Sequence, residues 1–134
     1  MDSGGSTYTK VLVIGVFDLL HKGHLNLLKK AANLGKLTVG IVSDSAVKRQ
    51  KGKSRPIQDE LYRQELVSSL SCVYGTFIVN DFIFPEVEVN SHDIICVGAD
   101  QQHFDMTYVP FEKHYILPRT PDVSTSDIVK KLKG

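Results

Sequence analysis

Two histidines three residues apart, His21 and His24, flank Gly23 in the segment GVFDLLHKGH at residues 15–24. This segment follows an apolar run and leads into a predicted helix, where free backbone N–H groups and the helix dipole favour anions. A spacing of three places both imidazoles on one side of a helical turn. The glycine allows a ligand to approach the backbone closely. These residues therefore predict an anion site at which imidazole N–H groups stabilise a phosphate in a transition state.

Two alternatives for the histidine pair remain open. A zinc site needs three or four ligands, and no cysteine or carboxylate stands at a supporting spacing. The histidines could instead cap the helix or lie on the surface without a function. The coincidence of the glycine, the end of a strand and the start of a helix favours the anion site.

A group of cations follows the second apolar run, in a chain whose charges are otherwise balanced. They are Lys48, Lys51, Lys53 and Arg55. A run of charge is usually a solvated surface, but this one comes at the presumed phosphate site. We expect Lys51 to be the catalytic cation, with Lys48 as the next candidate.

The elements that must position these residues follow from hydrophobic periodicity. Short β-branched runs predict strands buried on both faces, and apolar residues at helical spacing predict helices. The strands are expected at residues 10–16, 37–42, 77–79, 93–97 and 114–117. The helices are expected at residues 24–34 (closed by Gly35), 58–70 and 126–132, with a helical turn at 45–49 and a loop at 50–56. Leu61, Leu66, Val67 and Leu70 are the expected apolar side of the second helix. Residues 80–92 fit either a helix or an extended segment.

Strands that alternate with helices predict an α/β fold with a doubly wound, parallel five-stranded sheet and helices on both faces. Ligands on such sheets bind at the carboxyl ends of the strands, near the point where the strand order reverses. The length of 134 residues fits a single domain, expected at residues 10–134 after a flexible leader at residues 1–9.

Composition excludes several classes of partner. The formal net charge of +1 predicts neither nucleic-acid binding nor a charged membrane surface. The apolar run at residues 11–17 is far shorter than the roughly 20 residues of a membrane helix. Residues 1–9 lack the pattern of a signal peptide. Two cysteines, Cys72 and Cys96, are too few for a disulfide scaffold, so a cytoplasmic location is expected.

Two motifs resemble those of a known family. The pattern G-x-F-D-x-L-H-x-G-H at residues 15–24 is similar to that of the H-x-G-H nucleotidyltransferase superfamily, particularly the cytidylyltransferase-like enzymes. RTPDVSTSDI at residues 119–128 resembles the R-T-x-x-x-S-T-[ST]-x-I motif of the glycerol-3-phosphate, phosphocholine and phosphoethanolamine cytidylyltransferases. The order and separation of the motifs agree with those enzymes, so the resemblance covers residues 10–132 and implies a Rossmann-like fold.

The resemblance implies a reaction in which a phosphate oxygen of an acceptor attacks the α-phosphorus of a nucleoside triphosphate and pyrophosphate leaves. It implies four catalytic residues: His21, His24, Lys51 and Arg119. The nucleotide-binding residues it implies are Gly15, Val16, Phe17, Gly23, Lys48, Asp100, Arg119, Thr120, Ser124, Thr125 and Ser126. Asp100 could equally be a turn residue at a strand end.

Asp18 and Arg63 are the residues that the resemblance places near the acceptor. Asp18 could instead orient His21, and Arg63 could be a surface residue of its helix. The R-Y-V-D segment of the family's dimer interface corresponds to Ser71–Tyr74, which reads SCVY. A homodimer is still expected, but this segment lacks the residues that usually form the dimer contacts.

The nucleotide is open between two candidates. The K-G-x-S-R-P element at residues 51–56 resembles the adenylyltransferase domain that makes ADP-heptose, whereas residues 119–128 resemble the CTP users. We favour CTP because the second match is longer. The leading hypothesis is thus a Mg²⁺-dependent cytidylyltransferase acting on a phosphorylated or phosphonate small molecule similar to glycerol 3-phosphate. The alternatives are an adenylyltransferase that uses ATP and a sugar 1-phosphate, and a nucleotide-binding module without turnover.

Overall fold

The computed structural model describes residues 8–98 and 104–117, and its centre is a five-stranded parallel sheet. The strands are β1 (Lys10–Gly15), β2 (Lys36–Val42), β3 (Gly75–Val79), β4 (Ile94–Gly98) and β5 (His114–Leu117). Their order across the sheet is β3-β2-β1-β4-β5, and every neighbouring pair is parallel. The predicted doubly wound sheet is confirmed.

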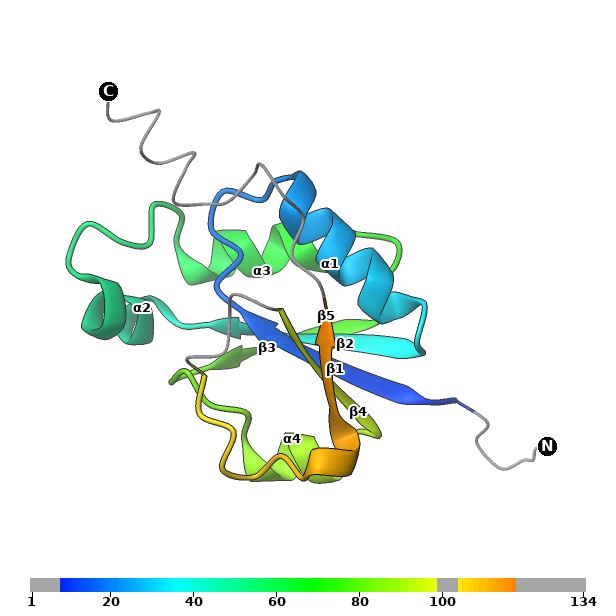
Figure 1. Cartoon of the computed structure of the whole chain (residues 1–134). Coiled ribbons are helices and arrows are strands. Elements are labelled where there is room, and N and C mark those ends of the chain that lie inside the picture. The colour runs from blue at the N-terminus through cyan, green and yellow to red at the C-terminus, as the bar shows by residue number, and fades with distance from the viewer. Residues whose placement is uncertain (1–7, 99–103, 118–134) are drawn as a thin grey trace.

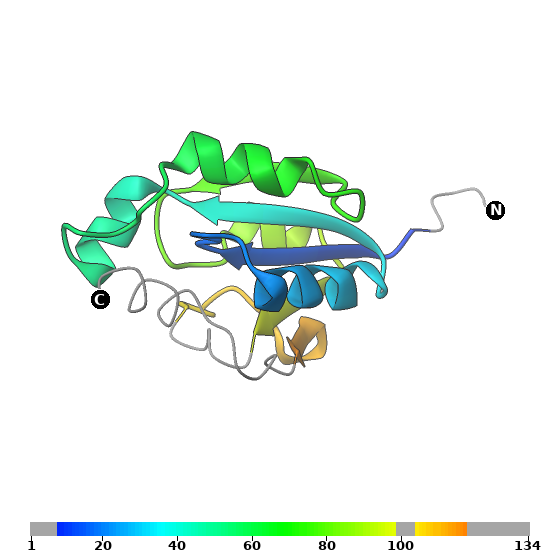
Figure 2. The ribbon, with the colours of Figure 1, turned by 90° about the horizontal axis from the view of Figure 1, so that it is seen from above.

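Helices cover both faces of the sheet, as predicted. They are α1 (Lys22–Ala32), α2 (Asp44–Lys51), α3 (Glu60–Ser68) and α4 (Glu86–Asn90), with a 3₁₀ turn at Phe111–Lys113. Figure 1 shows α1 and α3 on one face and α4 on the other. Both views place α2 beyond the carboxyl end of β2 (Figures 1 and 2). No helix within the described residues is long and apolar enough to cross a bilayer.

The central strand β1 is buried on both sides, which explains its continuous apolar sequence. Its residues alternate between two clusters. Leu12 and Ile14 belong to a core that includes Phe84 and Val89 on the α4 side. Val11 and Val13 belong to a second core with Leu28, Ala31 and Val67 from α1 and α3. This double burial holds the end of β1 rigidly in the middle of the fold.

The strand order reverses between β1 and β4. From β1 the chain adds β2 and β3 on one side, then returns to add β4 and β5 on the other. In open α/β sheets the crevice at such a reversal binds the ligand, at the carboxyl ends of the strands. The segment that follows β1 therefore lies where a ligand is expected.

Several element boundaries differ from those predicted. Helix α1 ends at Ala32 with Asn33 as its C-cap, so Gly35 does not cap it. A Cβ atom at Gly35 would lie 2.2 Å from the Thr9 carbonyl oxygen, which explains the glycine by close backbone approach. Helix α2 runs on to Lys51, where the sequence predicts a loop, and α4 forms within the unassigned residues 80–92. The helix predicted at 126–132 lies outside the described residues.

Candidate active site

The turn between β1 and α1 carries the histidine pair at the carboxyl edge of the sheet. It follows Gly15, the last residue of β1, and leads into α1 at Lys22. Figure 2 shows this end of α1 on the side of the sheet toward which β1 and β2 point. Phe17 and Leu19 have φ of 55° and 52°, a left-handed conformation that is costly for residues other than glycine. Strained backbone of this kind is concentrated at functional sites.

His21 is the N-cap of α1. Its Nδ1 atom accepts a hydrogen bond from the Gly23 N–H at 3.0 Å. The His21 N–H in turn donates to Nδ1 of His24 at 3.1 Å, so the two histidines form a reciprocal capping box. His21 thus caps the helix, as one alternative from the sequence expected, and the cap fixes the orientation of the ring that an anion would meet.

These two bonds define the tautomer of each ring. A nitrogen that accepts from a backbone N–H carries no proton, so in the neutral imidazoles the proton resides on Nε2. The rings stack with their centroids 3.9 Å apart and an interplanar angle of 26°. Each Nδ1 atom faces the helix backbone, and Nε2 lies on the far side of the ring. The turn therefore presents two adjacent Nε2–H donors at the N-terminus of a helix whose first turn has no acidic residue.

His24 is held neutral by its surroundings. Burial, and then the charge of neighbouring His21, lowers the pKa of His24 from 6.5 to about 3. The Phe17 ring contacts the His24 ring edge to face, with centroids 5.4 Å apart. A neutral imidazole still donates one hydrogen bond from Nε2. Positive charge at the site must therefore come from lysine, arginine and the helix dipole.

The low pKa of His24 predicts how stability depends on pH. In the unfolded chain His24 gains a proton as the pH falls through 6.5, whereas in the folded chain it does so only near 3. Its contribution is thus complete above pH 6.5 and is lost on acidification, by up to about 2 kcal/mol at pH 5. Urea denaturation at pH 7.5 and pH 5 should show a larger loss in the wild type than in His24→Asn. Equal losses in both proteins would contradict the buried, neutral ring.

Helix α2 carries the two predicted lysines to the same edge of the sheet. Ser43 caps it directly after β2, and Gly52 ends it with φ of 98°, a conformation that glycine adopts without strain. Lys48 and Lys51 are one turn apart and lie on one side of the helix, and both are exposed. Because β2 is adjacent to β1, the start of α2 and the histidine turn follow neighbouring strand ends, and the two lysines lie further along α2.

Arg63 is not a surface residue, so that alternative is wrong. Its side chain is fully buried. Nε donates to the Gln58 carbonyl oxygen at 2.9 Å, and Nη1 donates to those of Val16 and Val42 at 2.8 Å each. Nη2 donates to Oδ1 of Asp44 at 2.7 Å. The guanidinium therefore joins the ends of β1 and β2 to the start of α2 inside the described fold. The acceptor role predicted for Arg63 stays a prediction.

Asp18 is also internal, with 1% of its surface exposed. Its carboxylate accepts hydrogen bonds from the backbone N–H groups of Ile57 and Gln58 at 2.7 and 2.9 Å. This geometry gives Asp18 a structural contact across the fold. The acceptor role predicted for it stays a prediction.

The remaining predicted residues divide into two groups. Gly15, Val16, Phe17 and Gly23 belong to the described segment that forms the histidine turn. The others lie outside the described residues, namely Asp100, Arg119, Thr120, Ser124, Thr125 and Ser126. Asp100 comes two residues after the carboxyl end of β4, the strand beside β1 at the reversal of strand order. The assigned roles of these residues stay predictions.

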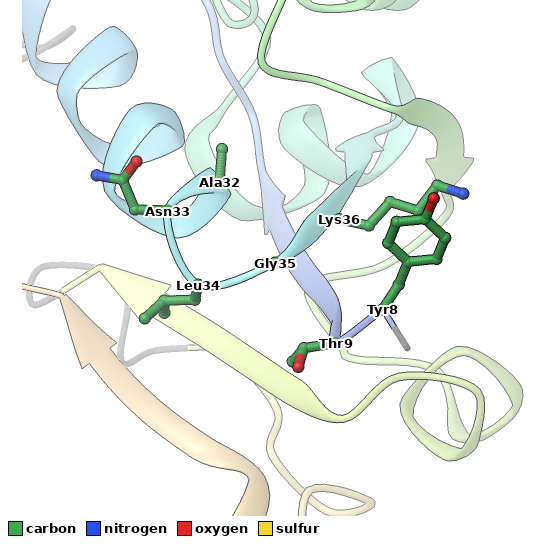
Figure 3. A pocket seen from close by; sticks show the side chains of 7 residues that line it. All are labelled: Tyr8, Thr9, Ala32, Asn33, Leu34, Gly35 and Lys36. Atoms are coloured by element: carbon green, nitrogen blue, oxygen red, sulfur yellow. The ribbon is translucent and has the colours of Figure 1, made fainter. Parts of the chain in front are cut away.

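A hollow of about 490 Å³ lies at the opposite edge of the sheet. Figure 3 shows its lining, which comes from the segments before β1 and β2 and includes Tyr8, Thr9 and residues 32–36. Nζ of Lys36 lies 4.7 Å from the centre of the Tyr8 ring and 3.7 Å from that of Tyr74. No predicted site residue lines this hollow, so it is separate from the histidine turn.

The described residues do not fit a resident magnesium ion. Within residues 8–98 and 104–117, no group of three or more His, Cys, Asp or Glu side chains could hold a metal. The donors of the histidine turn are N–H groups, whereas Mg²⁺ prefers carboxylate and phosphate oxygens. The magnesium predicted from the sequence stays a prediction, as a companion of the triphosphate substrate.

A parallel sheet with an H-x-G-H turn at its strand reversal is the arrangement of the H-x-G-H nucleotidyltransferases. Comparison with known families agrees, because the model of the cytidylyltransferase-like family matches residues 12–131. The chain belongs to the cytidylyltransferase-like family of nucleotidyltransferases. The resemblance found in the two sequence motifs is therefore confirmed.

Two curated proteins illustrate what the chain is similar to. The chain is 40% identical over 126 residues to the bifunctional protein HldE of Helicobacter pylori strain HPAG1, covering 92% of this chain and 27% of that protein. It is 33% identical over 127 residues to the HldE of a Nitratiruptor species, covering 92% of this chain and 28% of that protein. The chain thus spans little more than a quarter of these curated relatives.

A solved structure has the same fold. It is the crystal structure of the lipopolysaccharide core biosynthesis protein from Thermoplasma volcanium GSS1, with a TM-score of 0.66 and 28% identity. The match covers 87% of this chain and 99% of that one. The Rossmann-like α/β architecture predicted from the sequence is confirmed.

Proposed function

We propose that this chain transfers AMP from ATP to a sugar 1-phosphate, as an adenylyltransferase of the ADP-heptose synthase type. The observation that carries nucleotidyl transfer is the pair of stacked imidazoles with Nε2–H donors at the start of α1. The HldE relatives support the heptose type. The name of the Thermoplasma volcanium protein supports an acceptor used in building cell-surface sugars.

The nucleotide proposed here, ATP, differs from the CTP that the sequence analysis favours. The resemblance of residues 119–128 to the CTP users favours CTP, but the relatives support ATP instead. The element KGKSRP at residues 51–56, which resembles the ADP-heptose enzymes, agrees with them. A cytidylyltransferase is the second candidate, and the motif at residues 119–128 is the observation that favours it.

The proposed reaction needs no nucleophile from the protein. An oxygen of the sugar 1-phosphate attacks the α-phosphorus of ATP, and the bond from that phosphorus to the bridging oxygen of the β-phosphate breaks. Pyrophosphate leaves and takes the electron pair of that bond. Negative charge grows on the phosphoryl oxygens during this step, and preorganised donors stabilise such charge most.

The residues of the turn and of α2 divide this work. His21 and His24 donate Nε2–H bonds to the non-bridging α-phosphate oxygens and hold the α-phosphorus so that its bond to the leaving pyrophosphate lies in line with the attacking oxygen. Lys51 and Lys48 bring positive charge to the phosphates, which the neutral imidazoles lack. Because the nucleophile is already ionised, no general base is required. Magnesium enters with the triphosphate.

Pyrophosphate release with ATP and with CTP tests the proposal. With heptose 1-phosphate as the acceptor, we expect kcat/KM for ATP to exceed that for CTP by at least tenfold. Reactions without an acceptor provide the background. Faster release with CTP would establish the second candidate. The absence of release with either nucleotide, over a panel of sugar phosphates and glycerol 3-phosphate, would indicate a binding module without turnover.

A further inference from the structure

The turn that carries the histidines is fastened to a segment about forty residues further along the chain. The Leu19 N–H donates to Oε1 of Gln58 at 3.0 Å. In the opposite direction, the N–H groups of Ile57 and Gln58 donate to the Asp18 carboxylate at 2.7 and 2.9 Å. We call these four residues the latch. It joins the start of α1 to the segment that precedes α3.

The latch acts on strained backbone. Leu19 has φ of 52°, and Phe17, two residues earlier, has φ of 55°. A left-handed residue of this kind is unfavourable on its own and persists only where the surrounding structure holds it. The Gln58 side chain accepts the one backbone donor of Leu19, so it stabilises the strained conformation directly.

The strained residue is close to the reacting groups. Leu19 precedes His21 by two residues, and the His21 N–H fixes Nδ1 of His24. A change in the backbone of Leu19 would turn the His21 N–H away from that acceptor. The latch is therefore connected through the backbone to the hydrogen bond that orients the His24 ring.

Gln58 connects the turn to the cationic segment as well. Its N–H donates a hydrogen bond to Asp18, and its side-chain oxygen accepts one from the Leu19 N–H. Its carbonyl oxygen accepts a hydrogen bond from Nε of Arg63. The chain between Lys51, which ends α2, and Gln58 is only six residues long. Gln58 thus anchors the point at which the cationic segment returns to the histidine turn.

We propose that Gln58 is a positioning residue for nucleotidyl transfer, acting through Leu19 on the two imidazoles. This inference rests on the proposed function of the histidine turn. Gln58 lies outside the two motifs that define the family resemblance. Its side-chain oxygen, rather than the length of its side chain, is the group that does the positioning.

Three variants separate the oxygen from the rest of the side chain. Gln58→Met keeps nearly the same length but removes the acceptor, and kcat should fall at least tenfold while KM for the nucleotide stays within threefold. Gln58→Glu keeps an oxygen for the Leu19 N–H and should restore kcat to within about fivefold of the wild type. Gln64→Met is the matched control. Gln64 lies on α3, is half-buried and bonds Thr76 at 3.2 Å, so its loss should leave kcat unchanged.

A spectroscopic measurement tests the role of Gln58 without relying on enzyme activity. The ¹⁵N resonances of the His21 and His24 side chains, and the Leu19 amide, should shift or broaden in Gln58→Met and stay unchanged in Gln64→Met. If the wild type released no pyrophosphate, the proposed function would fail, and these spectra would still decide whether the latch orders the turn.

Several results would overturn the inference. A Gln58→Met protein with kcat within twofold of the wild type would exclude a positioning role, whatever its spectra show. A Gln58→Glu protein as slow as Gln58→Met would show that the oxygen is not the operative group. A slow Gln58→Met protein with unchanged imidazole resonances would mean that Gln58 acts elsewhere than through Leu19.

Discussion

His24→Ala should fold and lose turnover by about 10²–10³-fold, the usual effect of removing one preorganised donor from a developing oxyanion. The loss should appear in kcat, because the Nε2–H bond strengthens as charge moves onto the α-phosphate oxygens. Steady-state pyrophosphate release gives the measurement. Turnover within about threefold of the wild type would remove His24 from the catalytic residues.

His21 requires a control for its second role as the helix cap. His21→Ala removes both the Nε2–H donor and the cap, and the lost cap alone costs about 1 kcal/mol of stability. His21→Asn supplies a side-chain oxygen where Nδ1 accepts from Gly23, and asparagine is a favoured N-cap. We expect His21→Asn to keep the stability of the wild type and to be as slow as His21→Ala. An active His21→Asn protein would show that the cap is the whole contribution of His21.

Arg63→Ala should lower the free energy of unfolding by about 3–5 kcal/mol, because it leaves three carbonyl oxygens and a carboxylate without their donor. One fully buried side chain joins three parts of the site, so no local rearrangement can replace it. Urea denaturation monitored by circular dichroism measures the change. A loss below about 1 kcal/mol would contradict the assigned role.

Two variants define which feature of Arg63 matters. Arg63→Lys keeps the charge but not the planar set of donors, so it should recover less than half of the lost stability. Asp44→Asn keeps an oxygen that Nη2 can reach and removes only the charge of the pair. It should therefore cost much less than Arg63→Ala. Equal losses in the two proteins would place the effect in the ion pair alone.

The sheet and the histidine turn could be predicted from the sequence because their signals are local. Residues 10–16 and 37–42 are nearly continuous apolar runs rich in β-branched residues, a pattern typical of strands buried on both faces. The H-x-G-H pattern places two imidazoles at the start of a helix by spacing alone. The structure adds the direction of each ring, which depends on the hydrogen bonds of Nδ1.

The sequence predicts α2 too short and does not assign α4, because each of these helices buries few side chains. In α2 only Ala46 and Val47 are buried, and in α4 only Val89. Helices of eight and five residues are shorter than the window of about 11–18 residues over which an apolar face is recognised, so periodicity cannot define their ends. Ser43 is a favoured N-cap residue directly before α2, and it is the available signal for that helix.

The internal position of Arg63 could have been inferred from the register of α3. Val67 is buried four residues later, so Arg63 occupies the same face of the helix. The expected apolar side of α3 includes Leu61, which is 68% exposed.

The contact of Asp18 with Gln58 has no comparable signal in the sequence. It joins residues 40 positions apart, and no local pattern encodes such a pair.

The most direct test of the account is a crystal structure of the full chain with magnesium and a slowly hydrolysed ATP analogue. The account predicts oxygens of the α-phosphate at hydrogen-bond distance, about 3 Å, from Nε2 of both His21 and His24. It also predicts the Lys51 ammonium within reach of the same triphosphate. A nucleotide bound at the hollow beside Lys36, with both imidazoles remote from every phosphate oxygen, would contradict it.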